Sequence, residues 1–169
     1  MVLCEGFSET VARHVRDIQT MASRIGIESA SFTNEVSTAH WQQVRDFPLR
    51  QGALIYRVTV PRMAVAPALK TICGRDGGES APAMAIDTTA GVIWIAGLPN
   101  REGAEQFPKL ITLAQQHHGH AVMFAAPPEL KNSIDVWGPP PPALPLMREL
   151  KRQFDPQGIL NAGRFLSGL

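Results

Sequence analysis

The stretch ALIYRVTV, residues 53–60, decides the fold. Leu54, Tyr56, Val58 and Val60 occupy every second position, and Ile55, Arg57 and Thr59 lie between them. Period two is typical of a β-strand with one buried face, because successive side chains point to opposite faces of a sheet. The sequence therefore predicts a strand over 53–60, with Tyr56 in the core and Arg57 on the opposite face.

Further elements follow this strand at short intervals. Apolar spacings of three and four residues predict a helix that ends at Gly74, and a second helix over about 103–118 that ends at Gly119. Between these helices, residues 84–87 and 92–98 flank a short connection with Gly91, which indicates a hairpin, and Trp94 is predicted to lie in the core. Residues 121–126 form the last predicted strand.

The order of these elements indicates the fold class. Strand, helix, strand, strand, helix, strand is the split βαβ plan of ferredoxin-like domains. We therefore predict an α+β fold in which an antiparallel sheet carries its helices on one face. The glycine-rich stretch GRDGGES, residues 74–80, is predicted to be an exposed loop.

The first fifty residues add elements that this plan does not contain. Val2 to Cys4 favour a strand, and Ser8 is a candidate cap for a helix that Gly26 ends. A weaker helix is predicted from Ser37 up to Pro48. These elements extend the sheet or cover its open edge, and the sequence does not choose between the two arrangements.

Composition restricts the class of protein. The formal net charge is +1, with 16 basic and 15 acidic residues and no run of Lys or Arg, so nucleic acid is not an expected partner. The two cysteines have no CxxC spacing, which argues against a zinc site and favours a reducing compartment. No apolar stretch reaches membrane-spanning length, and no signal-like start is present, so a cytoplasmic location is expected. Because a strand is predicted at once after Met1, we interpret the chain as a piece of a longer protein.

The end of the chain has a different character. Four consecutive prolines, residues 139–142, predict a stiff polyproline II arm. A final helix follows with one apolar face, made of Leu146, Met147, Leu150 and Phe154. Beyond the helix, DPQG is a predicted turn, and ILNAGRF follows it.

This end carries a resemblance to a known family. The stretch MRELKRQFDPQGILNAGRF, residues 147–165, resembles the closing motif of FAD-linked oxidases of the vanillyl-alcohol oxidase superfamily, in which a helix precedes F-D-P-x-G, I-L-N-P-G and a basic residue. The chain departs from the motif at Ala162, where the family usually has proline, so the turn is less rigid there. With the preceding DVWGPPPP segment, residues 134–166 are most similar to the E subunits of bacterial glycolate oxidases.

The resemblance implies an architecture and a function. Residues 1–133 would be a ferredoxin-like cap, or substrate, domain, and residues 134–169 a proline-rich arm, terminal helix and tail that dock on an FAD domain. FAD would be bound mainly by an amino-terminal domain outside this chain, since the chain shows no glycine-rich pyrophosphate loop after a strand. The implied reaction is oxidation of glycolate or a similar 2-hydroxy acid.

The resemblance also implies partners. They are the FAD domain of the same protein and the related flavoprotein and iron-sulfur subunits of a glycolate oxidase complex, through which a loose association with the membrane is expected. A cap without its FAD domain exposes an apolar face, so the isolated chain is expected to self-associate.

Candidate site residues have competing interpretations. Asn161 and Arg164 would lie near the cofactor by resemblance, or else cap a turn and form a surface ion pair. Arg57 is a candidate for binding a substrate carboxylate, although a solvated sheet face is the more common outcome. Trp137 would contact the flavin domain or pack on the cap. The cluster His117, His118 and His120 resembles a metal site, but a polar helix end is preferred, so no metal is predicted.

An alternative function belongs to another class. A free-standing ferredoxin-like module would bind a small ligand or a protein through its open sheet face, without flavin. The carboxyl-terminal motif distinguishes the two hypotheses, because only the oxidase gives Asn161 and Arg164 a role.

Overall fold

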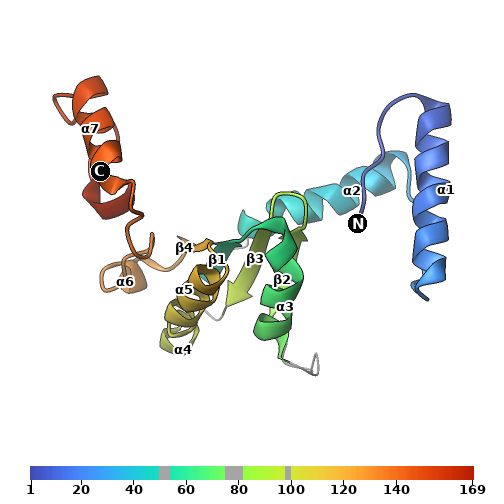
Figure 1. Cartoon of the computed structure of the whole chain (residues 1–169), viewed down its shortest axis with the longest axis horizontal. Helices are drawn as coiled ribbons and strands as arrows, with labels where there is room; N and C mark the ends of the chain where they lie inside the picture. The colour runs from blue at the N-terminus through green and yellow to red at the C-terminus, as the bar shows by residue number, and fades with distance from the viewer. Residues whose placement is uncertain (50–53, 75–81, 98–99) are drawn as a thin grey trace. The chain divides into compact units, whose positions relative to one another are not determined.

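The computed structural model describes residues 1–49, 54–74, 82–97 and 100–169 (Figure 1). The chain divides into two compact units, Met1–Val44 and Arg45–Leu169, which are described separately. The predicted boundary between residues 133 and 134 stays a prediction. Most of the predicted GRDGGES loop lies outside the described residues, as do Ala53 and Leu98.

The first unit contains helix α1, Ser8–Arg24, and most of helix α2, Asn34–Asp46. Gly26 has a φ of 72°, the left-handed conformation that ends many helices, so the predicted end of α1 is confirmed. Neither helix contains a buried residue.

Three predictions for this unit are wrong in detail. Phe7 is the N-cap of α1 and makes no side-chain cap bond, so Ser8 already lies inside the helix. Helix α2 begins at Asn34 rather than Ser37. Residues 2–4 form no strand, and Val2 and Leu3 are exposed. A strand persists only beside a hydrogen-bonded neighbour, and local β-propensity does not supply one.

The second unit is built on a four-stranded antiparallel sheet. The strands are β1 Leu54–Thr59, β2 Ala83–Asp87, β3 Val92–Gly97 and β4 His120–Ala125. Their spatial order is β2-β3-β1-β4, so β3 and β1 are the two central strands. The predicted α+β class and antiparallel sheet are therefore confirmed.

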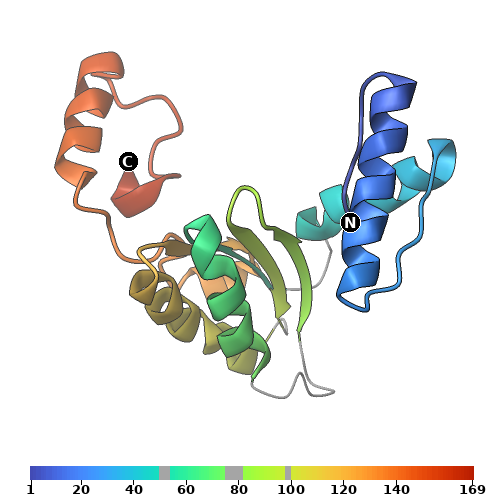
Figure 2. The ribbon, with the colours of Figure 1, turned by 45° about the vertical axis from the view of Figure 1, so that its right-hand side comes forward.

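Helices cover one face of this sheet. Helix α3, Val65–Cys73, and helix α5, Gln106–Gln116, lie on the same side of the strands (Figures 1 and 2). Short 3₁₀ turns occur at Phe47–Leu49, Arg62–Ala64 and Leu166–Gly168, and the one-turn helices α4 and α6 span Arg101–Ala104 and Pro128–Lys131. The side chains of alternate β1 residues meet the helices, which leaves Arg57 and Thr59 on the other face.

Tyr56 is the centre of the core between sheet and helices. It is fully buried, stacks on Phe107 with ring centroids 5.9 Å apart, and its hydroxyl donates to the Gly103 carbonyl oxygen at 2.5 Å. Asn100 caps helix α4 by accepting from the Gly103 amide at 2.8 Å, so the acceptor is held in place. Burial raises the pKa of Tyr56 to about 12.

Replacing Tyr56 by Phe is expected to lower the free energy of unfolding by about 1 kcal/mol, the net value of a typical hydrogen bond. A phenol whose pKa is raised in the fold stabilises the fold below its unfolded pKa near 10, and this contribution is lost as pH rises toward 12. Denaturant unfolding at pH 8 and pH 11 measures both effects, and Tyr56→Phe should remove the phenolate part of the alkaline loss. Since Tyr56 is the single tyrosine of the chain, absorbance at 295 nm follows its titration directly. A phenol that titrates near 10 in the folded chain would contradict the burial argument.

The carboxyl-terminal segment extends from the sheet. The Met123 amide donates to the Val136 carbonyl oxygen at 2.8 Å, so the chain beyond α6 lies along the outer edge of β4. Helix α7, Leu144–Phe154, follows the prolines, and the chain after it turns back along the helix (Figure 2). Among the described residues, no helix combines the length and the apolar character needed to cross a membrane.

Candidate functional site

Arg57 occupies the open face of the sheet and is half-buried. Its guanidinium carbon lies 5.7 Å from the centre of the Trp94 ring, on the neighbouring strand β3. Its Nε atom is buried without a hydrogen-bond partner, and so is the Thr59 hydroxyl two residues along the same face. Such unpaired buried polar atoms are costly, so a bound water molecule or a ligand is expected to supply the missing partners.

Trp94 is therefore not in the core that the sequence predicted for it. It pairs with Arg57 in the sheet register and faces away from the helices, where it makes an edge-to-face contact with Phe124 at 5.0 Å. The prediction assumed that a tryptophan on a strand is buried among the helices. Because Trp94 lies directly opposite Arg57 in the sheet, both side chains point to the face without helices. Tyr56, one residue from Arg57, is in the predicted core.

A pocket of about 660 Å³ adjoins Arg57. Strand β4 contributes His120 and Val122, the end of α5 contributes Ile111 and Gln115, and His118 follows that helix. The arm and the tail contribute the remaining lining residues, namely Trp137, residues 139–142, Phe165 and Leu166. No Asp or Glu is among the lining residues, so Arg57 is a cation without a competing carboxylate there.

His120 is the second ionisable group that this pocket brings close to Arg57. Partial burial lowers the pKa of His120, and the Arg57 cation lowers it further, although part of the side chain stays exposed. His120 is consequently neutral near pH 7 and can accept or donate one hydrogen bond. No group of three His, Cys, Asp or Glu side chains suited to a metal ion occurs in the part of the chain that the structure describes.

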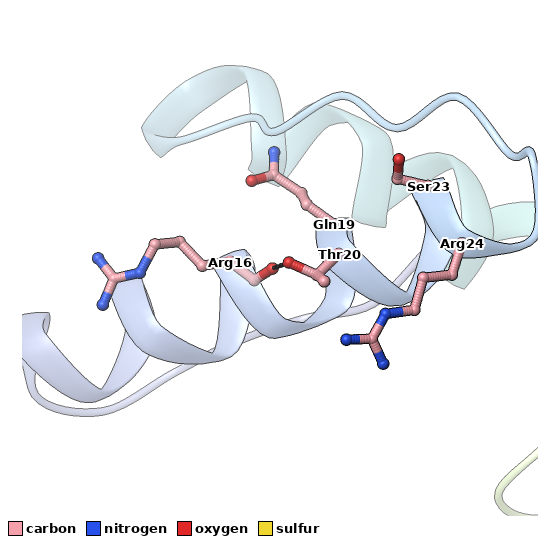
Figure 3. A pocket seen from close by; sticks show the side chains of 5 residues that line it. All are labelled: Arg16, Gln19, Thr20, Ser23 and Arg24. Atoms are coloured by element: carbon pink, nitrogen blue, oxygen red, sulfur yellow. Dashed lines mark hydrogen bonds between the residues drawn. The ribbon is translucent and has the colours of Figure 1, made fainter.

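A second hollow, of about 490 Å³, lies along α1 (Figure 3). Its lining residues are Arg16, Gln19, Thr20, Ser23 and Arg24, all from one helix. The Thr20 hydroxyl already donates to the Arg16 carbonyl oxygen at 2.8 Å. Because one helix alone lines this hollow, it does not enclose a ligand.

The tail is organised by Asp155, which is 7% exposed. Its carboxylate accepts hydrogen bonds from the backbone amides of Ile159 at 3.1 Å and Leu160 at 3.0 Å. The Lys151 ammonium also bonds this carboxylate, and it donates to the Leu160 carbonyl oxygen at 2.5 Å. The Lys151 charge and the two amides hold the pKa of Asp155 below its usual value, so the carboxylate is ionised at neutral pH.

This loop displays the residues that follow it. Ile159 and Leu160 are exposed by 71% and 60%, although both are large and apolar. Asn161 has a φ of 48° and its carbonyl oxygen accepts from the Arg164 amide at 3.0 Å, so the two candidate cofactor residues share one turn. Both side chains are exposed. In the described residues, the Arg164 guanidinium has no hydrogen bond or ion pair.

The structure brings some of the predicted residues together and separates others. Phe165 contacts Trp137 edge to face at 4.9 Å, so the tail reaches the pocket beside Arg57, and Trp137 packs within its own unit. Asn161 and Arg164 are not lining residues of that pocket. Sequence reasoning missed Lys151, Asp155 and His120 as organisers of the site. The spacing of four between Lys151 and Asp155, typical of a helical ion pair, was the available signal for the first two.

Comparison with known proteins adds one finding. Residues 117–165 match the family model for FAD linked oxidases, C-terminal domain. Searches among curated proteins and among solved structures gave no match. The match supports a C-terminal domain of an FAD-linked oxidase, and the family's description implies FAD as the cofactor. The matched residues include β4, the arm, α7 and the Asp155 loop, which are the parts that form the pocket wall and the exposed tail.

Proposed function

We propose that this chain is the cap part of an FAD-linked oxidoreductase subunit that converts glycolate or a similar 2-hydroxy acid into the 2-oxo acid. In this proposal the chain acts as the E subunit of a bacterial glycolate oxidase does. The FAD would be held mainly by a separate domain, onto which the carboxyl-terminal tail docks.

The observation that carries this proposal is the form of the tail within the matched region. A buried carboxylate fixes the loop, and the fixed loop displays apolar Ile159 and Leu160 next to polar Asn161 and Arg164. Holding apolar side chains in fixed, exposed positions does not stabilise the isolated chain, because no apolar area is buried. The same fixed side chains give a partner a preorganised surface to bind. Helix α7 adds an apolar face of the same kind, since Leu146, Leu150 and Phe154 are exposed by 62%, 46% and 78%.

The residues of this tail fit one side of a flavin cofactor. An unpaired guanidinium suits a phosphate or the negative charge of a reduced flavin, and an amide can bond the ring edge. The chemistry that bound FAD supplies is acceptance of a hydride equivalent from the α-carbon of the acid. Asn161 and Arg164 would orient and stabilise the cofactor from the cap side, and they would not bind it alone.

Arg57 is the proposed anchor of the substrate carboxylate. Its Nε atom lacks a partner, and Trp94 supports the guanidinium from one side. A carboxylate could form two parallel hydrogen bonds with the fork of Arg57. His120, which also lines the pocket, adds a polar group that can form a hydrogen bond with the acid.

The proposed partners follow from the same model. They are the FAD domain and the related flavoprotein and iron-sulfur subunits of a glycolate oxidase complex, in the cytoplasm or loosely held at the membrane through that complex. Without these partners, the exposed apolar residues of α7 and the tail favour self-association of the chain.

The test of this proposal replaces Asn161 and Arg164 together by Ala in the protein that includes the FAD domain. We expect flavin affinity to fall at least tenfold, since one lost charge-assisted hydrogen bond costs roughly 1.5–3 kcal/mol and about 1.4 kcal/mol is a factor of ten. The ratio of flavin to protein absorbance after dialysis measures retention, and glycolate oxidation with an artificial electron acceptor measures turnover.

Arg148→Ala is the matched control. Arg148 is an exposed arginine on α7, and two residues rotate a helix by about 200°, which places it opposite Leu146. This variant should keep both flavin and turnover. If the double variant also keeps both, the proposed role of the tail is wrong, and the binding-module alternative becomes the better description.

A further inference from the structure

The pocket beside Arg57 is larger and more apolar than a site for glycolate needs to be. Glycolate carries no apolar group, whereas the lining of the pocket includes an apolar wall made of Trp137, Phe165 and four consecutive prolines. Sites of about 300–1,000 Å³ typically hold molecules of drug size, and this pocket measures about 660 Å³. A two-carbon acid bound at Arg57 would leave the apolar wall in contact with water.

We infer that the pocket takes a carboxylic acid with a ring-sized apolar substituent, so that the carboxylate bonds Arg57 and the substituent packs against Trp137 and the prolines. As a statement about substrate, this inference rests on the proposed function and selects one class among 2-hydroxy acids. As a statement about binding, it needs only the described residues of this chain.

The charge distribution requires an anionic head group. Arg57 is half-buried, its Nε atom has no partner, and the lining contains no carboxylate. A neutral ligand would leave the guanidinium unpaired, and a cation would be repelled by it.

The wall favours an apolar substituent on the ligand. Trp137 and Phe165 meet edge to face at 4.9 Å, so their rings already form a packed aromatic corner. The four prolines of the lining have apolar rings and lack amide donors. Ile111 adds an aliphatic contact from α5. A planar ring can pack against such a corner with aromatic contacts worth more than buried area alone.

The experiment measures binding to the full, flavin-free chain by titration calorimetry with three probes. 3-Phenyllactate has both the acidic head and the ring, glycolate has the head alone, and 2-phenylethanol has the ring alone. We expect 3-phenyllactate to bind at least tenfold more tightly than either of the other two. This comparison uses the unmodified chain, so it does not depend on whether a variant folds.

Variants then assign the binding to Arg57. Arg57→Met keeps the length of the stem but removes the charge, and it should weaken 3-phenyllactate binding at least tenfold. Arg57→Lys should recover part of that loss, because it restores a cation without the planar fork. Arg62→Met is the control, since Arg62 is an exposed arginine that does not line the pocket.

Three outcomes would overturn the inference. They are equal binding of glycolate and 3-phenyllactate, no binding of 3-phenyllactate, and binding that Arg57→Met leaves unchanged. Its failure can be separated from failure of the proposed function, because calorimetry uses no flavin and the Asn161 and Arg164 test uses no acid for its retention measurement. A chain that binds 3-phenyllactate but whose tail variant keeps its flavin would support the pocket and refute the oxidase tail.

Discussion

Replacing Gly119 by Ala is expected to destabilise the second unit by about 3 kcal/mol, near the upper end of the cost of overpacking. A Cβ atom at this position would lie 2.0 Å from the Thr59 carbonyl oxygen and 2.9 Å from Val60 Cγ1. The first of these atoms belongs to β1, so the clash is relieved only if the start of β4 moves away from the central strand. The same shift would displace His120, which pairs with Thr59 in the register.

Thermal unfolding followed by circular dichroism measures this effect. A loss of about 3 kcal/mol corresponds to a fall in Tm of about 6–12 °C for a chain of this size. Gly158→Ala is the control, because Gly158 has a φ of 66° but no atom within 4 Å of an added Cβ, so it carries backbone strain without a clash. Gly119 itself has no positive φ, so equal shifts in Tm for the two variants would mean that the contact with β1 costs no more than the strain at Gly158, and the clash argument would be wrong.

Replacing Asp155 by Asn is expected to release the tail while the sheet remains folded. Asn keeps the size of the side chain and one acceptor oxygen, but it lacks the charge that Lys151 and two amides share. Hydrogen exchange at the Ile159 and Leu160 amides should accelerate on the order of a hundredfold, because two charge-assisted bonds are weakened together. In the protein that includes the FAD domain, flavin retention should fall as well, although Asp155 is not proposed to touch the cofactor.

The pH dependence gives an independent check of the Asp155 loop. The pKa of Asp155 is lowered in the fold, so its stabilising effect is present above the unfolded value near 4 and is lost as pH falls through the lower folded value. Protection of the Leu160 amide should therefore disappear at acid pH in the parent chain and change little in Asp155→Asn. The exposed Arg152 and Glu149 pair, replaced as Glu149→Gln, is the control and should leave protection unchanged. Unchanged exchange in Asp155→Asn would show that the loop holds its form without the carboxylate.

The sheet could be predicted because its signal is local and repeated. Alternation over 54–59 sets which side chains meet the helices, and the short hairpin connection between β2 and β3 limits their pairing. The same reasoning failed for residues 2–4, where apolar residues favoured a strand but no neighbouring strand exists among the described residues. Propensity indicates what a segment can form, whereas pairing depends on partners far along the chain.

The site was predictable only in part for a related reason. Alternation placed Arg57 on the open face, and the carboxyl-terminal motif indicated the tail. The pocket forms only because the arm and the tail lie beside β4. Its contact between Trp137 and Phe165 could not be predicted, because the residues between them follow no single helix or strand period. Trp94 was misplaced because hydrophobicity alone does not tell which face of a sheet a large side chain covers.

The short sequence separations inside the Asp155 loop also bear on the order of folding. Its contacts join Lys151, Asp155 and Leu160, whereas the sheet must bring Tyr56 to Met123. Closing a loop of about ten residues takes roughly 10–100 ns, while pairing of distant strands is among the slow steps of folding. The terminal loop can thus acquire its shape before β1 and β4 have paired. A partner domain that recognises the loop could therefore bind it while the sheet is still unfolded.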